Sequence, residues 1–175
     1  KLNYFDLYES VRSVIFENLL HKHHYVRKNA LACVISVLNN FGVDSLPNEI
    51  IPTLKKLIEE DTDQSVVRSA YITLASIDSD ESLDVTKSLL QKQEISEIGE
   101  FLLLAIVKNL KNIAKQSSSS DKGKIIKLLI DMTQCKLNSI LFELSYSLLE
   151  ISSSTGVVKQ AVTLLSNLIN DLNDN

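Results

Sequence analysis

A repeated pattern of residues constrains the fold of this chain more than any other feature. The segment His24–Ala30 is echoed by Gln64–Ala70, so that Val26 and Val66 are 40 residues apart. A weaker echo at Asn138–Leu144 follows after about two further steps of similar length. Such a period is long enough for two helices and a turn, and a single helix pair cannot bury its apolar surface alone. The repeat therefore predicts a stack of helix pairs.

The spacing of apolar residues predicts that each repeat is helical. Between Val26 and Phe41 one apolar stripe and a second apolar face both follow helical spacing. Two apolar faces suit a helix with neighbours on both sides, and we expect Ala30 and Ala70 to be buried at close helix–helix contacts. The 4 Gly and 2 Pro are too few for the turns of a sandwich or barrel. We expect nine helices, over residues 6–20, 25–40, 48–60, 64–77, 80–92, 97–115, 121–134, 138–152 and 156–171.

The junctions between these segments carry residues that end or begin helices. Gly42 follows one segment, and Pro52 lies early in the next, where proline is tolerated. Asp61, Asp63 and Asp121 stand where a side chain can accept hydrogen bonds from the free N–H groups of a helix start. A proline in the first helix and an Asp before a Val-Arg pair in the second resemble a HEAT unit.

These features together predict an all-α fold. We expect an α-solenoid of HEAT/armadillo-like antiparallel helix pairs, with about four and a half repeats. Residues 1–175 are expected to form a single HEAT-repeat segment, a fragment of a longer adaptin-like trunk.

Composition and charge exclude several classes of function. The net charge of −4 and the pI near 5.4 lack the basic surface that nucleic-acid binding leaves. The chain also lacks the dense basic cluster of a protein that binds anionic lipid directly, so we expect only indirect membrane contact. The longest apolar run, Phe101–Val107, is far shorter than the ~20 residues that cross a bilayer. Cys33 and Cys135 are expected to be small core residues of a reduced protein.

The stretch Leu20–Leu38 resembles the beta subunit of the coatomer vesicle coat (beta-COP). In that family a His-containing turn leads into a Tyr-Val-Arg-basic-Asn-Ala helix, found here at Tyr25–Ala30. The similarity continues through Ile77–Asp84, Ile98–Glu100 and Glu143–Ser153, and so covers essentially the whole chain. The Tyr-Val-Arg-Lys core is shared with beta-adaptins, so the beta trunk of a clathrin adaptor, or another HEAT-repeat transport scaffold, is the alternative. The Asp-rich turn and the Ile-Gly-Glu segment favour the coatomer family.

This resemblance implies a function that the residue pattern alone does not show. It implies a structural scaffold of the COPI coat, acting in Golgi-to-ER and intra-Golgi vesicle-mediated protein transport. The implied partners are the other coatomer subunits, the delta subunit in particular, and a GTP-bound Arf-type small GTPase. The implied location is cytoplasmic, peripheral on the Golgi membrane and on COPI vesicles.

The most unusual cluster in the sequence is a basic turn. It contains His21, His23 and His24, followed by Arg27 and Lys28, and these five residues are the candidate site for an acidic partner. Three imidazoles could ligate a metal, but a structural zinc site needs four ligands and no Cys is adjacent, so we expect no metal here.

Two other interpretations of the charged residues remain open. Arg27, Lys28 and Arg68 recur at similar repeat positions and could form a basic ladder on the concave surface. The favoured alternative is that such arginines pair with an Asp of the neighbouring turn, such as Asp63. The pairs Asp61/Asp63 and Asp78/Asp80 suit helix caps better than acid–base catalysis. No phosphate-binding loop or nucleophile elbow is present. We therefore expect no enzyme and no cofactor; an enzyme or a ligand-binding helical bundle is disfavoured by the 40-residue period.

Overall fold

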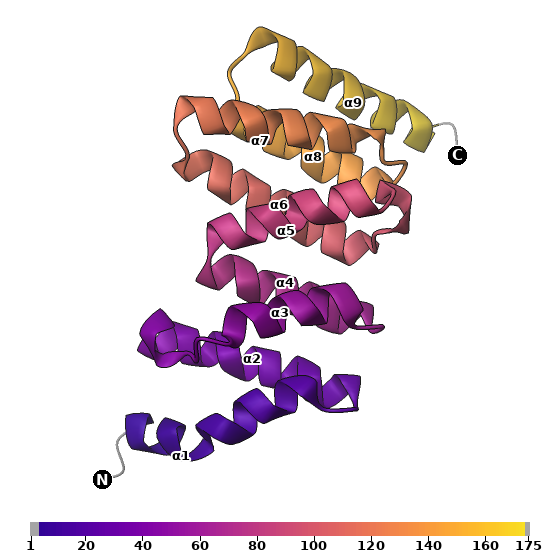
Figure 1. The fold of residues 1–175 in the computed structure, drawn as a ribbon. Helices are drawn as coiled ribbons and strands as arrows, with labels where there is room; N and C mark the ends of the chain where they lie inside the picture. Colours follow the sequence, from indigo (N-terminus) through magenta and orange to yellow (C-terminus); the bar gives the residue numbers. More distant parts are fainter. Residues whose placement is uncertain (1–3, 174–175) are drawn as a thin grey trace. The chain divides into compact units, whose positions relative to one another are not determined.

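The computed structural model describes the backbone of residues 4–173, and this part of the chain is helical apart from short turns (Figure 1). Its nine α-helices are α1 (Tyr4–Glu17), α2 (His24–Phe41), α3 (Ile50–Glu60), α4 (Gln64–Ile77), α5 (Ser79–Lys92), α6 (Glu100–Gln116), α7 (Ser119–Asp131), α8 (Asn138–Ile151) and α9 (Thr155–Asn173). Short 3₁₀ turns lie at η1 (Asn18–Leu20), η2 (Val43–Ser45), η3 (Ile95–Glu97) and η4 (Met132–Gln134). Residues 1–3 and 174–175 of the expected segment lie outside the described residues.

All nine expected helices are present, and the differences lie at their ends. The first expected helix, over residues 6–20, ends as an α-helix at Glu17 and tightens into η1, a common way for a helix to finish. Gly42 ends α2 with a positive φ of 82°, a conformation that glycine adopts without a Cβ clash. The prediction that Asp121 caps α7 is wrong. The N-cap is Ser118, whose hydroxyl donates to Asp121 Oδ2 at 3.0 Å, because the helix begins earlier than expected.

The chain divides into two compact units, Lys1–Val85 and Thr86–Asn175. In the first unit α1 packs on α2, α3 packs on α4, and α2 packs directly on α4. Ala30 and Ala70 are 5% and 0% exposed, so the prediction that both are buried is confirmed.

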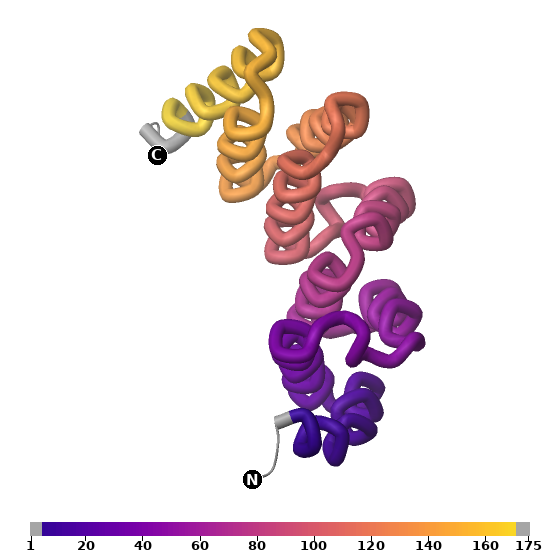
Figure 2. Tube along the Cα trace, turned by 90° about the vertical axis from the view of Figure 1, so that its left-hand side faces the viewer, coloured from indigo at the N-terminus to yellow at the C-terminus, as the bar shows by residue number. Residues whose placement is uncertain are grey.

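The second unit repeats this arrangement. Helix α6 packs on α7 and α8, α7 also contacts α8, and α8 packs on α9. Its core is aliphatic, with Leu103, Ile106, Leu110 and Leu144 fully buried. Figure 2 shows, from the side, how the chain turns back after each helix. Paired helices and the absence of strands in residues 4–173 confirm the all-α solenoid class.

The two cysteines differ in their surroundings. Cys135 is buried, as expected, and it follows η4. The prediction that Cys33 is a core residue is wrong, because its side chain is exposed. It lies on the face of α2 that borders a hollow of ≈ 600 Å³, which Val11 and Phe41 also line.

Candidate partner-binding site

Two turns of the first unit share one backbone arrangement, 40 residues apart in the repeat. In the α1–α2 turn the N–H of His23 donates to His21 Nδ1 at 3.1 Å. In the α3–α4 turn the N–H of Asp63 donates to Asp61 Oδ1 at 2.9 Å. In both turns the first side chain accepts from the amide two residues later, as in an Asx-turn. The two turns therefore present different side chains on similar backbones.

Arg27 joins these two turns. Its Nε and Nη2 donate to the two carboxylate oxygens of Asp61 at 2.6 and 2.7 Å, while Nη1 donates to the carbonyl of His21 at 2.7 Å and that of Lys22 at 3.0 Å. The side chains of Arg27 and Asp61 are only 14% and 3% exposed. The hydrogen bonds to Asp61 raise the pKa of Arg27, despite the opposing effect of burial. For Arg27, pairing with the neighbouring turn is thus confirmed, although the partner is Asp61 and not Asp63. Arg68 is exposed and forms no ion pair with a described residue, so the prediction is wrong for Arg68.

Asp63 instead caps α4. Its Oδ1 accepts from the N–H groups of Ser65 and Val66 at 3.0 and 3.1 Å. The hydroxyl of Ser65 also donates to Asp63, and this bond, with help from the two amides, lowers the pKa of Asp63. His24 Nε2 lies 3.9 Å from Asp63 Oδ2. The sequence-based prediction of a cap at Asp63 is therefore confirmed.

Helix α2 begins without such a cap. His23 occupies the N-cap position, and its side chain makes no capping hydrogen bond. The first turn of a helix carries a partial positive charge, which an acidic side chain offsets at α4 but not at α2. The start of α2 therefore remains more positive than the start of α4.

The five residues of the candidate site do not share one environment. His23, His24 and Lys28 are exposed, His21 is half-buried, and Arg27 is held by Asp61. No Asp or Glu occurs in the sequence between Glu17 and Asp44, and neither Lys22 nor Lys28 forms an ion pair within the part of the chain that is described. The turn is therefore locally basic in an acidic chain, and its binding to a partner stays a prediction.

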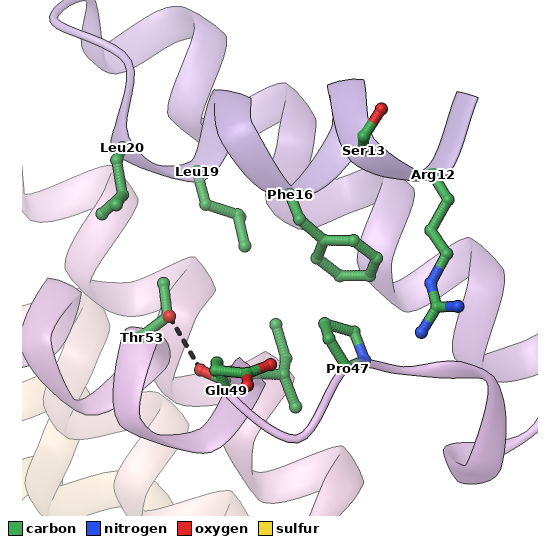
Figure 3. A pocket seen from close by; sticks show the side chains of 9 residues that line it. Arg12, Ser13, Phe16, Leu19, Leu20, Pro47, Glu49 and Thr53 are labelled. Carbon is green, nitrogen blue, oxygen red and sulfur yellow. Dashed lines mark hydrogen bonds between the residues drawn. The ribbon is translucent and has the colours of Figure 1, made fainter. Parts of the chain in front are cut away.

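Two hollows beside this turn were not anticipated from the sequence. One, of ≈ 440 Å³, is lined by His21, Lys22 and Lys56 among others. The next, of ≈ 340 Å³, is lined by Phe16 and Pro47, and Leu20 borders both hollows (Figure 3). These residues come from α1, η1, the α1–α2 turn, the segment before α3 and α3 itself, so no local spacing in the sequence brings them together.

The second unit has its own set of ion pairs, between α6 and α8. Lys111 Nζ lies 3.3 Å from Glu143 Oε1 and 3.4 Å from Glu150 Oε2, and Lys115 also pairs with Glu150. Burial opposes the charge of Lys111, but the hydrogen bond and charge of Glu143, with Glu150, raise its pKa overall. The Nζ of Lys111 also lies 5.1 Å from the centre of the Tyr146 ring. In both units, then, charged side chains connect one repeat to the next.

The described residues bring no three His, Cys, Asp or Glu side chains together in an arrangement that could hold a metal ion. In the same part of the chain, no helix combines the length and apolar character needed to cross a membrane.

Comparison with known proteins identifies the class to which this fold belongs. The family model of the adaptin N terminal region matches residues 5–175, and the chain belongs to this family. Among curated relatives, it is 27% identical to coatomer subunit beta of Toxoplasma gondii in an alignment of 183 residues. This alignment covers 100% of this chain and 16% of that protein. It is 26% identical to coatomer subunit beta of Sus scrofa in an alignment of 179 residues, which covers 100% of this chain and 18% of that protein.

A plant relative extends the same pattern. The chain is 24% identical to coatomer subunit beta-2 of Oryza sativa subsp. japonica over 161 residues, which are 92% of this chain and 17% of that protein. The resemblance to coatomer beta subunits that the sequence indicates is thereby confirmed. The chain spans about a sixth of the length of these relatives.

Proposed function

We propose that this chain is a scaffold segment of a COPI-type vesicle coat, and that it acts by holding other proteins and not by catalysis. The observation that carries the proposal is the similarity along the whole chain to coatomer beta subunits from an apicomplexan parasite and a mammal. The Arg27–Asp61 ion pair, which connects two successive repeats, suits a structural scaffold. The alternative, a clathrin-adaptor beta trunk, is not favoured, because these relatives carry the coatomer name.

The partners and the setting follow from the same proposal. The coat assembly consists of the other coatomer subunits, with the delta subunit as the direct neighbour, and a GTP-bound Arf-type GTPase recruits it. The protein works in the cytoplasm, on the surface of the Golgi membrane and of COPI vesicles. The single HEAT-repeat segment over residues 1–175 is part of a longer trunk in this proposal.

The test is purification of the tagged parent protein from cytosol, followed by mass spectrometry of the proteins that accompany it. We expect coatomer subunits, with the delta subunit among them. Recovery of clathrin-adaptor subunits in their place, or of no coat subunit at all, would contradict the proposal.

Membrane contact is indirect in this account. The net charge is −4, and the basic residues of the α1–α2 turn are too few to hold the chain on anionic lipid. We expect the 175-residue chain to stay in solution in a sedimentation assay with anionic liposomes at physiological salt. Strong, salt-sensitive sedimentation of the chain alone would show a direct lipid site.

A further inference from the structure

We propose that the groove between α1–η1 and α3 binds a short peptide segment of a protein partner, in which apolar residues lie next to acidic ones. This inference rests on the proposed function, since it names the kind of partner that the scaffold receives beside its basic turn. The groove is formed by the two hollows that share Leu20, and each half has its own chemistry.

The first half of the groove is mostly apolar. Phe16 and Leu19 point from α1 and η1 toward the opposite wall, where Pro47 and Thr53 lie (Figure 3). The hydroxyl of Thr53 donates to the carbonyl of Glu49 at 2.7 Å, so this polar group is already satisfied within α3. A hollow of ≈ 340 Å³ lies at the small end of the range of ligand pockets, about 300–1,000 Å³. It suits one or two apolar side chains.

The second half of the groove carries a small excess of positive charge, because Lys22, Arg27 and Lys56 line it together with Glu60 and Asp61. His21 and Lys22 line one wall and Lys56 lines the other. The nearby Arg27 and Asp61 neutralise each other, and Lys56 lies 3.9 Å from Glu60 in a pair whose side chains are 59% and 67% exposed. Lys22 forms no ion pair with any described residue. An incoming carboxylate can therefore pair with Lys22 without breaking the Arg27–Asp61 or the Lys56–Glu60 contact.

Leu20 connects the two halves. Its side chain is 61% exposed, although the neighbouring Leu19 is 1% exposed and belongs to the core. An exposed leucine between an apolar and a basic hollow is covered when a peptide with matching apolar and acidic residues lies along the groove. Burial of apolar surface supplies affinity there, while the charges fix the direction of the peptide.

An acidic peptide fits this groove better than two other anionic partners. Nucleic acid needs several phosphate contacts in a row, and direct binding to anionic membranes needs about four or more clustered basic residues. Beside an apolar hollow, the groove offers Lys22, Lys56 and His21 together with Glu60 and the Arg27–Asp61 pair, a combination that matches neither. Its chemistry matches carboxylates adjacent to leucine-like residues.

The test is fluorescence anisotropy of the 175-residue chain with a fluorescein-labelled peptide that carries leucines in its first half and glutamates in its second. One comparison peptide replaces the glutamates by lysines, and another replaces the leucines by serines. The variants are Leu20→Ser and Lys22→Glu, both at exposed positions, with Lys108→Glu on α6 as the matched control. Circular dichroism verifies that each variant is folded.

We expect saturable binding of the leucine–glutamate peptide, weakened at least about tenfold by either groove variant and unchanged by Lys108→Glu. Both comparison peptides should bind more weakly by a similar factor. No binding to the wild-type chain, or binding that both groove variants leave unchanged, would overturn the proposal. So would Lys22-dependent binding of duplex DNA or phosphatidylserine vesicles without binding of the peptide. None of these results alters which subunits accompany the parent protein, so the two proposals fail separately.

Discussion

The α1–α2 and α3–α4 turns use the same backbone arrangement with opposite charges. In the sequence the first reads His21-Lys22-His23 and the second reads Asp61-Thr62-Asp63. In both, the side chain of the first residue accepts from the amide of the third. Both carboxylates of the acidic turn form contacts within the fold, since Asp61 pairs with Arg27 and Asp63 caps α4. In the basic turn, by contrast, the exposed side chain of His23 makes no capping hydrogen bond, and that of Lys22 forms no ion pair with a described residue.

This difference separates stabilising residues from those available to a partner. Removing one member of a buried bidentate ion pair lowers the stability of the fold strongly, because the other charge is left buried without a partner. Exposed cations such as Lys22 and Lys28 contribute little to stability and remain free to meet another molecule. Two turns of the same shape can therefore serve the fold in one repeat and recognition in another.

The largest effect is expected from removing Arg27. Arg27→Ala leaves the carboxylate of Asp61, which is 3% exposed, without its cation, and should lower the free energy of unfolding by about 2–4 kcal/mol. Lys28→Ala, at the next position but exposed, should change it by less than about 0.5 kcal/mol. Urea denaturation followed by circular dichroism measures both. Equal effects of the two substitutions would mean that the ion pair does not hold the turns together.

An intermediate effect is expected at the helix contact behind the acidic turn. Ala70 is fully buried in α4, so Ala70→Leu should overpack the interface and cost about 1–3 kcal/mol. The matched control is Ala32→Leu in α2, where the side chain is exposed. Thermal melts of the two variants give the comparison. An unchanged melting temperature for Ala70→Leu would show that the repeat register assigned to α4 is wrong.

A smaller effect, dependent on pH, is expected at the cap of α4. The pKa of Asp63 is lowered by the Ser65 hydroxyl and by the amides of Val66 and Ser65, so the carboxylate is the form that stabilises the fold. That contribution is complete above the ordinary pKa of an unfolded carboxyl and is lost as the pH falls through the lowered pKa of the folded state. Asn also caps helices but does not titrate, so the stability advantage of the wild type over Asp63→Asn should shrink as the pH falls. An advantage that stays constant down to strongly acidic pH would contradict this.

Much of this fold could be predicted because helical spacing and the 40-residue period are local or regular signals. The position of Asp63 before an amphipathic segment was enough to predict its capping role. The sequence does not show whether Asp61 or Asp63 is the partner of Arg27, because the choice between two carboxylates in one turn depends on side-chain direction, which spacing does not encode. Cys33 was misassigned because a helix with two apolar faces does not reveal which face a neighbour covers.

The groove could not be predicted from the sequence. Leu20 and Lys56 belong to different helical elements, and their proximity depends on how α1 and α3 pack around α2 and α4. In the sequence, a leucine followed by a His-rich turn indicates the end of a helix and gives no sign of a groove. Only the structure shows that the exposed leucine borders two hollows of different chemistry.

The most direct test of this account is to give the basic turn the sequence of the acidic one. The triple variant His21→Asp, Lys22→Thr and His23→Asp keeps the backbone arrangement, adds a carboxylate cap to α2 and reverses the charge beside the groove. We predict an unchanged helical spectrum, a free energy of unfolding raised by roughly 0.5–1 kcal/mol, and at least about tenfold weaker binding of the leucine–glutamate peptide. Unaltered peptide binding, or a clear loss of stability, would contradict the claim that the two turns share a backbone and differ in charge and role.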